Sequence, residues 1–157
     1  MNATTPRPNV FLDTSALFAG IWSDEGGARV LLRMGEAGAI VLLVSPQVLA
    51  ELERTLSRKA PDALPLAALI VDRTGAQVVP QADASHLPLA SGLVSHPGDA
   101  AVLAAAWQAS ADFFVTLDRK HFLENPKLAQ AVPFHVGTPG DALAWIRGRF
   151  RTRQDQA

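Results

Sequence analysis

The stretch that decides the fold is Asn9-Val10-Phe11-Leu12-Asp13-Thr14-Ser15-Ala16, in which three apolar residues stop at a carboxylate and two hydroxyls. Three consecutive apolar residues of this kind predict a short strand that is buried on both faces. Open α/β sheets hold their ligands beyond the carboxyl ends of the strands, which is where Asp13 would lie. The simpler alternative is that Asp13, Thr14 or Ser15 only caps the following helix, because these side chains accept hydrogen bonds from free amides.

The same pattern recurs much later in the chain, in Asp112-Phe113-Phe114-Val115-Thr116-Leu117-Asp118. Here a second short apolar strand runs into a second acid, Asp118. Parallel strands that each end in an acid bring both carboxylates to one edge of a sheet. The recurrence therefore favours a functional site over two unrelated helix caps.

Length and composition indicate one globular domain. The chain has 157 residues, 48% of them apolar, which is enough to form a core without disulfides or a structural metal. Cysteine is absent, which excludes disulfides and thiolate metal sites and fits a reducing compartment. The longest apolar run, residues 39–44, is far shorter than the roughly 20 residues of a membrane span. We expect a single cytoplasmic domain over residues 1–157, with residues 1–8 and 151–157 flexible.

Hydrophobic periodicity predicts alternating strands and helices. The predicted strands are residues 10–12, 40–44, 77–79, 113–116 and 132–136. Helices are predicted at residues 16–22, 23–36, 46–59 and 66–73, from Asp99 onward, and after a cap at residues 138–141. Residues 81–98 are predicted as a loop with one helical turn near Ala84, and residues 119–123 as a turn. This order predicts an α/β fold, a parallel sheet with helices on both faces.

Four of the acids, Glu51, Glu53, Asp99 and Asp118, are ambiguous when each is taken alone. Glu51 and Glu53 flank the apolar stripe of the same predicted helix at similar angles, and a helical wheel does not choose between them. Asp99 lies in the first turn of its helix, where an acid also stabilises the helix dipole. Asp118 is also a common type of residue in a plain turn.

Together, four segments resemble the PIN-domain family in order and spacing. They are residues 10–16, Ser45-Pro46-Gln47-Val48-Leu49-Ala50-Glu51-Leu52, Asp99-Ala100-Ala101-Val102-Leu103-Ala104 and Ala111-Asp112-Phe113-Phe114-Val115-Thr116-Leu117-Asp118. The resemblance covers nearly the whole chain. Most members are ribonucleases that depend on magnesium (Mg²⁺) or manganese (Mn²⁺), and many, in the VapC-like branch, are toxins of bacterial toxin–antitoxin pairs. The resemblance implies a PIN-like three-layer α/β/α fold whose short parallel sheet has the first strand at its centre, beside the fourth.

Carried over residue by residue, the resemblance implies a catalytic site of four acids, Asp13, Glu51, Asp99 and Asp118. Its metal ligands would be Asp13, Asp99 and Asp118, and its supporting hydroxyls would be those of Thr14, Ser15 and Thr116. The chain departs from the family at two places. Many relatives have Asn in place of Ser15 and a more acidic run in place of His96-Pro97-Gly98. We therefore expect at least one divalent ion at this site, and the sequence does not decide whether a second ion binds there.

The chemistry of these residues favours a hard ion. Carboxylates and water suit Mg²⁺ or Mn²⁺, whereas zinc prefers His or Cys, and no two His residues have ligand spacing. We expect His96 and His121 to be loop or substrate-side residues. The ion would orient the phosphodiester, lower the pKa of the attacking water and neutralise the leaving 3′ oxygen. Arg119 and Lys120 are placed to bind neighbouring phosphates, with solvated turn charges as the alternative.

Charge distribution is compatible with a nucleic-acid substrate. The net charge is −1, but without the four acids of the predicted site the remaining residues carry +3. Much of this excess lies near the C-terminus, in Arg147, Arg149, Arg151 and Arg153. Such a cluster either contacts phosphates or an acidic partner, or is simply solvated.

The sequence thus predicts a metal-dependent endoribonuclease, with the toxin role as an implication of the resemblance. Its expected partners are an RNA substrate, a cognate antitoxin and a second copy in a homodimer, the last two from the resemblance only. One alternative is a non-catalytic RNA- or protein-binding module, although such a module would gain little from four mutually repelling acids. The other is an aspartyl-phosphate phosphatase using Asp13, which is disfavoured because Ser15 occupies the position of its second Asp.

Overall fold

The computed structural model describes residues 6–156. Its strands are β1 (Asn9–Leu12), β2 (Val41–Val44), β3 (Gln77–Val78), β4 (Phe113–Val115) and β5 (His135–Gly137). Its α-helices are α1 (Thr14–Trp22), α2 (Gly27–Glu36), α3 (Pro46–Lys59), α4 (Leu64–Arg73), α5 (Leu87–Ser91), α6 (Pro97–Gln108), α7 (Pro126–Ala131) and α8 (Pro139–Asp155). A 3₁₀ turn, η1 (Pro61–Ala63), precedes α4, and a π-helical turn, η2 (Arg119–Leu123), follows β4.

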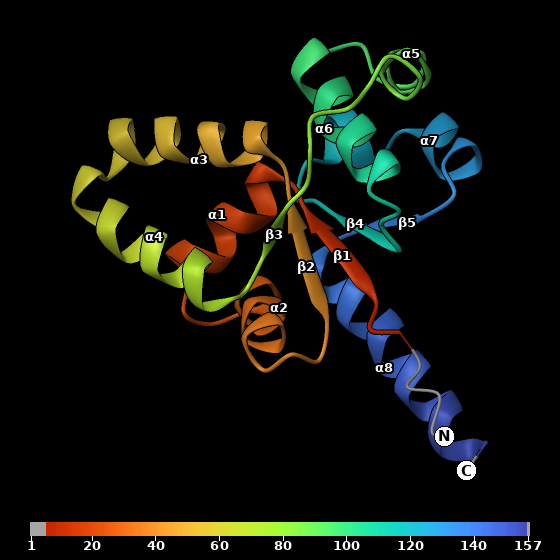
Figure 1. Ribbon diagram of the computed structural model, residues 1–157, viewed down its shortest axis with the longest axis horizontal. Helices are drawn as coiled ribbons and strands as arrows, with labels where there is room; N and C mark the ends of the chain where they lie inside the picture. The colour runs from red at the N-terminus through yellow and green to blue at the C-terminus, as the bar shows by residue number, and fades with distance from the viewer. Residues whose placement is uncertain (1–5, 157) are drawn as a thin grey trace.

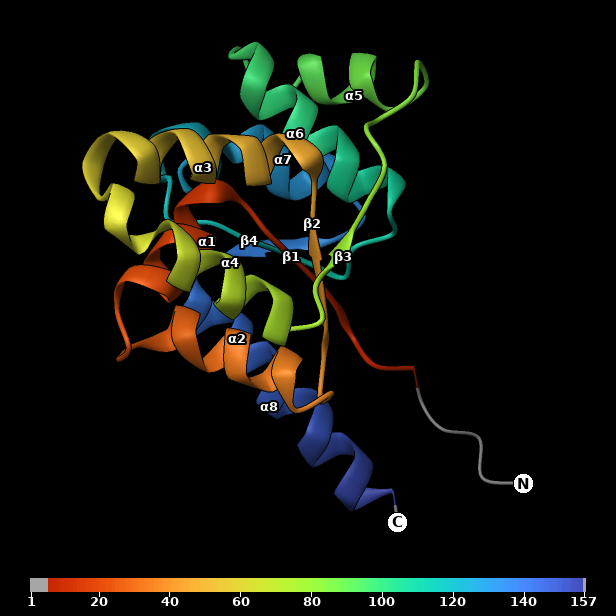
Figure 2. The same ribbon diagram turned by 60° about the vertical axis from the view of Figure 1, so that its left-hand side comes forward.

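The strands form one parallel sheet in the order β3-β2-β1-β4-β5. The central strand is β1, flanked by β2 and β4, as the resemblance implied (Figure 1). Helices α3, α6 and α7 lie on one side of the sheet, and α2 and α8 on the other (Figure 2). This three-layer arrangement confirms the predicted α/β fold.

Burial on both faces explains why β1 is continuously apolar. Val10, Phe11 and Leu12 are at most 1% exposed. The Phe11 ring stacks on that of Phe114 in β4, with ring centroids 5.5 Å apart. Because Leu12 pairs with Val115 in the sheet, the residues that follow the two strands emerge side by side.

The structure differs from the sequence prediction mainly in short helices. Residues 81–98 contain α5, and α7 lies where no helix was predicted. Both helices are too short to show a helical period in sequence. Burial stabilises them instead, because Ala90 of α5 and Leu128 of α7 are completely inaccessible.

Several predicted boundaries are also corrected. The helix predicted over residues 23–36 begins only at Gly27, after the N-cap Gly26, which makes no side-chain hydrogen bond. The last strand is β5, shifted toward the C-terminus from residues 132–136, and α8 continues through Asp155 into the segment expected to be flexible. Of the N-terminal segment expected to be flexible, residues 1–5 lie outside the described residues. In the described part of the chain no helix is long and apolar enough to cross a bilayer.

Candidate active site

Asp13 lies at the junction of β1, α1 and the end of β4. Its amide donates a hydrogen bond to the Val115 carbonyl at 3.1 Å, which extends the pairing of the two strands by one residue. Its carboxylate Oδ1 accepts from Ser15 Oγ at 2.6 Å and from the Ala16 amide at 2.9 Å, and Oδ2 accepts from Thr116 Oγ1. Asp13 is therefore the N-cap of α1 and, at the same time, faces the edge of the sheet where β1 and β4 end.

The environment of Asp13 disfavours its charged form. Only 6% of the residue is exposed, and this burial raises the pKa of its carboxyl above the ordinary value. Hydrogen bonds from Ser15, Thr116 and Ala16 act in the opposite direction, and the nearby Asp118 carboxylate adds to the increase. Two of the three hydroxyls predicted as supporting groups, those of Ser15 and Thr116, therefore contact the first acid directly.

Glu51 reaches the same region from α3. Its Oε2 accepts from Thr14 Oγ1 at 2.6 Å, and its Oε1 accepts from Gln47 Nε2 at 3.2 Å. The Gln47 amide also donates to the carbonyl of Gly98 at 3.2 Å, which connects α3 to the first turn of α6. Glu51 is thus held in one orientation by groups from α1 and α3.

The third and fourth acids meet beside a histidine. In η2, His121 Nδ1 lies 2.9 Å from Asp118 Oδ2 and 3.8 Å from Asp99 Oδ2. Ligand atoms of Asp99, Asp118 and His121 all lie within 4.8 Å of one another, close enough to hold one ion. Asp13 is not part of this compact group. His121 was not predicted as a ligand, because its approach depends on the π-helical turn that follows Asp118.

Electrostatics at Asp99 are those of a crowded acidic site. Burial raises the pKa of Asp99 above its ordinary value, and the carboxylates of Asp118 and Glu51 also raise it. The imidazoles of His121 and His96 act in the opposite direction. A divalent cation would relieve this repulsion, and carboxylate oxygens are the ligands that Mg²⁺ and Mn²⁺ prefer. The residues present therefore fit such an ion.

All four predicted acids line one cavity of about 440 Å³. Thr14 and Ser15 line it too, while Thr116 is fully buried behind Asp13. Because the acids come from the junction of β1 and α1, from α3, from α6 and from the loop after β4, only the fold brings them together. We call this space the acid cavity.

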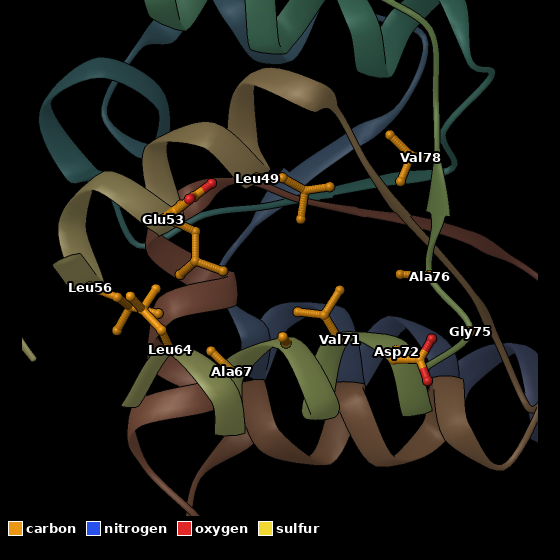
Figure 3. Close-up of a pocket in the computed structure, with 12 residues that line it drawn as sticks. Leu49, Glu53, Leu56, Leu64, Ala67, Val71, Asp72, Gly75, Ala76 and Val78 are labelled. Atoms are coloured by element: carbon orange, nitrogen blue, oxygen red, sulfur yellow. The ribbon is translucent and has the colours of Figure 1, made fainter. Parts of the chain in front are cut away.

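Glu53, the alternative to Glu51, points elsewhere. It lines a larger apolar pocket of about 710 Å³ between α3 and α4, whose other polar side chain is Asp72 (Figure 3). Leu49, Leu56 and Val71 form much of its wall. This pocket does not bring several acids together, so its chemistry is unsuited to binding a metal ion.

The predicted phosphate-binding cations lie outside the acid cavity. Arg119 forms an ion pair with Glu124 at 3.1 Å and lines a different hollow beside β5, and Lys120 lines neither space. The cation that does line the acid cavity is Lys59, at the end of α3. Sequence reasoning missed Lys59, because helical spacing alone does not say which end of α3 the cavity reaches.

Comparisons with known proteins agree with the fold. A family model described as PIN domain matches residues 9–120. Among solved structures, the chain is similar to VapBC2 from Rickettsia felis, bound to a promoter DNA fragment, with 15% identity and a TM-score of 0.57 over 82% of this chain and 96% of that one. It is also similar to VapC20 from Mycobacterium tuberculosis, a toxin that cleaves the sarcin-ricin loop, with 21% identity and a TM-score of 0.52 over 71% of this chain and 91% of that one. No curated protein matched the chain by sequence.

Proposed function

The chain belongs to the PIN-domain family, and from that premise we propose that it is a Mg²⁺- or Mn²⁺-dependent endoribonuclease that hydrolyses phosphodiester bonds of RNA. The observation that carries the proposal is the convergence of Asp13, Glu51, Asp99 and Asp118 on the acid cavity. Four carboxylates in one partly buried space repel one another, and a site of this kind gains most from a divalent cation.

Each acid has a role that follows from its contacts. Asp99 and Asp118 would hold the ion, and Asp13, kept in position by Ser15 and Thr116, would add its carboxylate from the end of β1. When bound, the ion supplies charge neutralisation at the phosphate and a lower pKa for the attacking water. His121 would orient Asp118 through its 2.9 Å contact, and Glu51, fixed by Thr14, would orient the attacking water.

The contacts of Asp13 also weigh against the phosphatase alternative. A carboxylate nucleophile needs a free oxygen directed at the phosphorus atom. Here both oxygens of Asp13 accept hydrogen bonds from the protein, and the side chain is almost completely buried. Asp13 is better placed to bind a cation with its remaining lone pairs than to attack a phosphate.

The toxin role extends the proposal to partners. The similar Rickettsia structure is a VapBC assembly, and the similar Mycobacterium protein is a toxin that cleaves RNA of the sarcin-ricin loop. On this basis we infer that the chain is the toxin of a toxin–antitoxin pair and is inhibited by a cognate antitoxin. The resemblance to the family extends the proposal to action on RNA in the cytoplasm and to a homodimer.

Cleavage of RNA with and without metal tests the proposal. Purified protein is incubated with a labelled structured RNA in Mg²⁺, in Mn²⁺ and in EDTA, beside an Asp99→Asn variant purified in the same way. We expect internal cleavage by the parent in either metal, none in EDTA and none by the variant. Equal cleavage by the parent and the variant, or cleavage that persists in EDTA, would contradict the proposal.

A further inference from the structure

The acid cavity continues beyond the acids along the facing sides of α1 and α3. In this second half the lining side chains are not acidic, and they include Phe18 from α1 and Thr55 and Lys59 from α3. Helices α1 and α3 pack against each other, so these groups form two walls of one space. A metal site does not require an aromatic side chain or a cation in this half of the cavity. A metal ion bound by the acids therefore does not explain why Phe18 and Lys59 line it.

An aromatic pair forms the α1 wall and extends it to the surface. The rings of Phe18 and Trp22, one helical turn apart, are stacked with centroids 5.7 Å apart and an interplanar angle of 10°. Trp22 is 61% exposed, more than any other large hydrophobic residue in the described part of the chain. Leu117, on the loop after β4, also lines the cavity and is 44% exposed. The exposed apolar surface is therefore continuous with the cavity.

Lys59 supplies positive charge on the opposite wall. It is exposed and, within residues 6–156, forms no ion pair with a carboxylate. A solvated ammonium at the mouth of a cavity that holds four acids is suited to an anionic ligand that also approaches the metal. Its neighbour Arg58 lines a different hollow on the outer side of α3, so the two cations face different spaces.

We propose that this half of the cavity binds one nucleotide of single-stranded RNA next to the cleaved phosphate, an inference that rests on the function proposed above. The base stacks against the Phe18–Trp22 pair, and Lys59 contacts a backbone phosphate. Aromatic side chains bind unpaired bases by stacking, whereas the bases of a duplex are hidden from such a surface.

Equilibrium binding tests the stacking surface separately from catalysis. The affinity of a fluorescently labelled single-stranded RNA oligonucleotide is measured by anisotropy in EDTA and again in Ca²⁺. Trp22→Ala should weaken binding by roughly five- to a hundredfold, in line with the loss of one stacked base. Trp22→Phe should retain most of the affinity, because it keeps an aromatic face. Leu66→Ala, at a residue of α4 that is 55% exposed and does not line the acid cavity, is the control and should leave the affinity unchanged.

The cation is tested by the salt dependence of the same binding. Lys59→Gln should lower the slope of log affinity against log salt by about 0.7, the value for one phosphate contact on a single strand. Arg58→Gln, the matched control on the same turn of α3, should leave the slope unchanged. Equal effects of the two substitutions would overturn the role of Lys59.

Several results would overturn the stacking proposal. They are an unchanged affinity for Trp22→Ala, an equal loss for duplex and single-stranded RNA, or no binding by the parent in either buffer. If Trp22→Ala instead abolishes self-association of the parent in sedimentation and leaves RNA affinity unchanged, the surface is a protein contact and the proposal is wrong. Because binding is measured without turnover, a parent that binds through Trp22 but does not cleave contradicts only the proposed enzymatic function.

Discussion

At the scale of single residues, Asp13 shows how one side chain serves both fold and site. It caps α1, extends the β1–β4 pairing and faces the acid cavity. Asn caps a helix about as well as Asp, so Asp13→Asn removes the charge while keeping the cap. The substitution therefore separates the electrostatic cost of the acid from its structural contribution.

The pKa of Asp13 predicts how this cost depends on pH. Because burial raises the pKa in the folded protein above the ordinary value of 3.8, ionisation is harder in the folded than in the unfolded state. In EDTA, the stability of the parent relative to Asp13→Asn should be greatest below about pH 3.8 and should fall as pH rises through the folded pKa. Urea unfolding of both proteins across this range measures the difference. If the stability of the parent relative to Asp13→Asn instead increases with pH, the folded protein favours the charged form of the carboxylate.

The two glutamates of α3 provide a matched pair. Glu51 lines the acid cavity and accepts hydrogen bonds from Thr14 and Gln47, whereas Glu53 lines the apolar pocket of Figure 3. Glu51→Gln should lower the cleavage rate by at least about tenfold, because it removes a charge that orients water beside the ion. Glu53→Gln should cleave at the rate of the parent. If the two variants are equally impaired, Glu51 has no special role.

Site residues differ in how far the sequence alone could identify them. Asp13 and Asp118 could be predicted from the chain itself, because each follows a short apolar strand. Glu51 and Asp99 needed the family resemblance, since a helical wheel cannot say which side of a helix faces a distant strand end. His121 and Lys59 depend on a π-helical turn and on the packing of α3 against α1, which no local pattern encodes.

At the scale of elements, the strands and long helices follow from hydrophobic patterns, and the short helices do not. The prediction for α3 is accurate because Ser45 caps it and Pro46 occupies its first position, a local signal that needs no tertiary contact. For α5 and α7 the stabilising contribution comes from buried Ala90 and Leu128, so their existence depends on the rest of the fold. Local sequence patterns therefore predict the strands and long helices that carry the acids, but not the short helices α5 and α7.

Two helical glycines test the packing of elements against the sheet. An added Cβ at Gly35 of α2 would lie 2.4 Å from Leu42 Cδ1 and 2.9 Å from its Cγ, and Leu42 is buried in β2 with little room to move. Gly35→Ala should therefore destabilise the protein by about 1–3 kcal/mol.

Gly148 of α8 is the matched control for Gly35. An added Cβ there meets no atom within 4 Å, so Gly148→Ala should stabilise the protein by about 0.5–1 kcal/mol through helix propensity alone. Thermal unfolding of both variants measures the two effects. Shifts of the same sign would contradict the close packing of α2 on β2.

Over the whole molecule, the arginines near the C-terminus lie apart from the acid cavity. The last turns of α8 extend away from α3 and α6 in both views of the fold (Figures 1 and 2). Arg149 lies over the ring of Trp145 at 5.0 Å, and Arg153 over that of Phe150 at 5.7 Å, so two of the arginines contact their own helix. This arrangement favours the solvated alternative for the C-terminal cluster.

Truncation tests this interpretation of α8. Deleting residues 151–157 should leave both the cleavage rate and the salt dependence of binding unchanged for a short oligonucleotide, which cannot reach from the acid cavity to the end of α8. The same measurements on the full chain are the reference. A slope that flattens after truncation would mean that these arginines contact phosphate.

We claim that the acid cavity binds a divalent cation in the folded protein, and the melting temperature with and without Mn²⁺ measures this binding. An ion that binds only the folded state stabilises it by mass action, by about 2.7 kcal/mol at a hundred times its Kd. The melting temperature is compared in EDTA and in saturating Mn²⁺ for the parent, Asp99→Asn and Glu53→Gln. We expect a clear upward shift for the parent and Glu53→Gln, and a much smaller shift for Asp99→Asn, which in EDTA should melt no lower than the parent. An equal Mn²⁺ shift in all three proteins would contradict the claim.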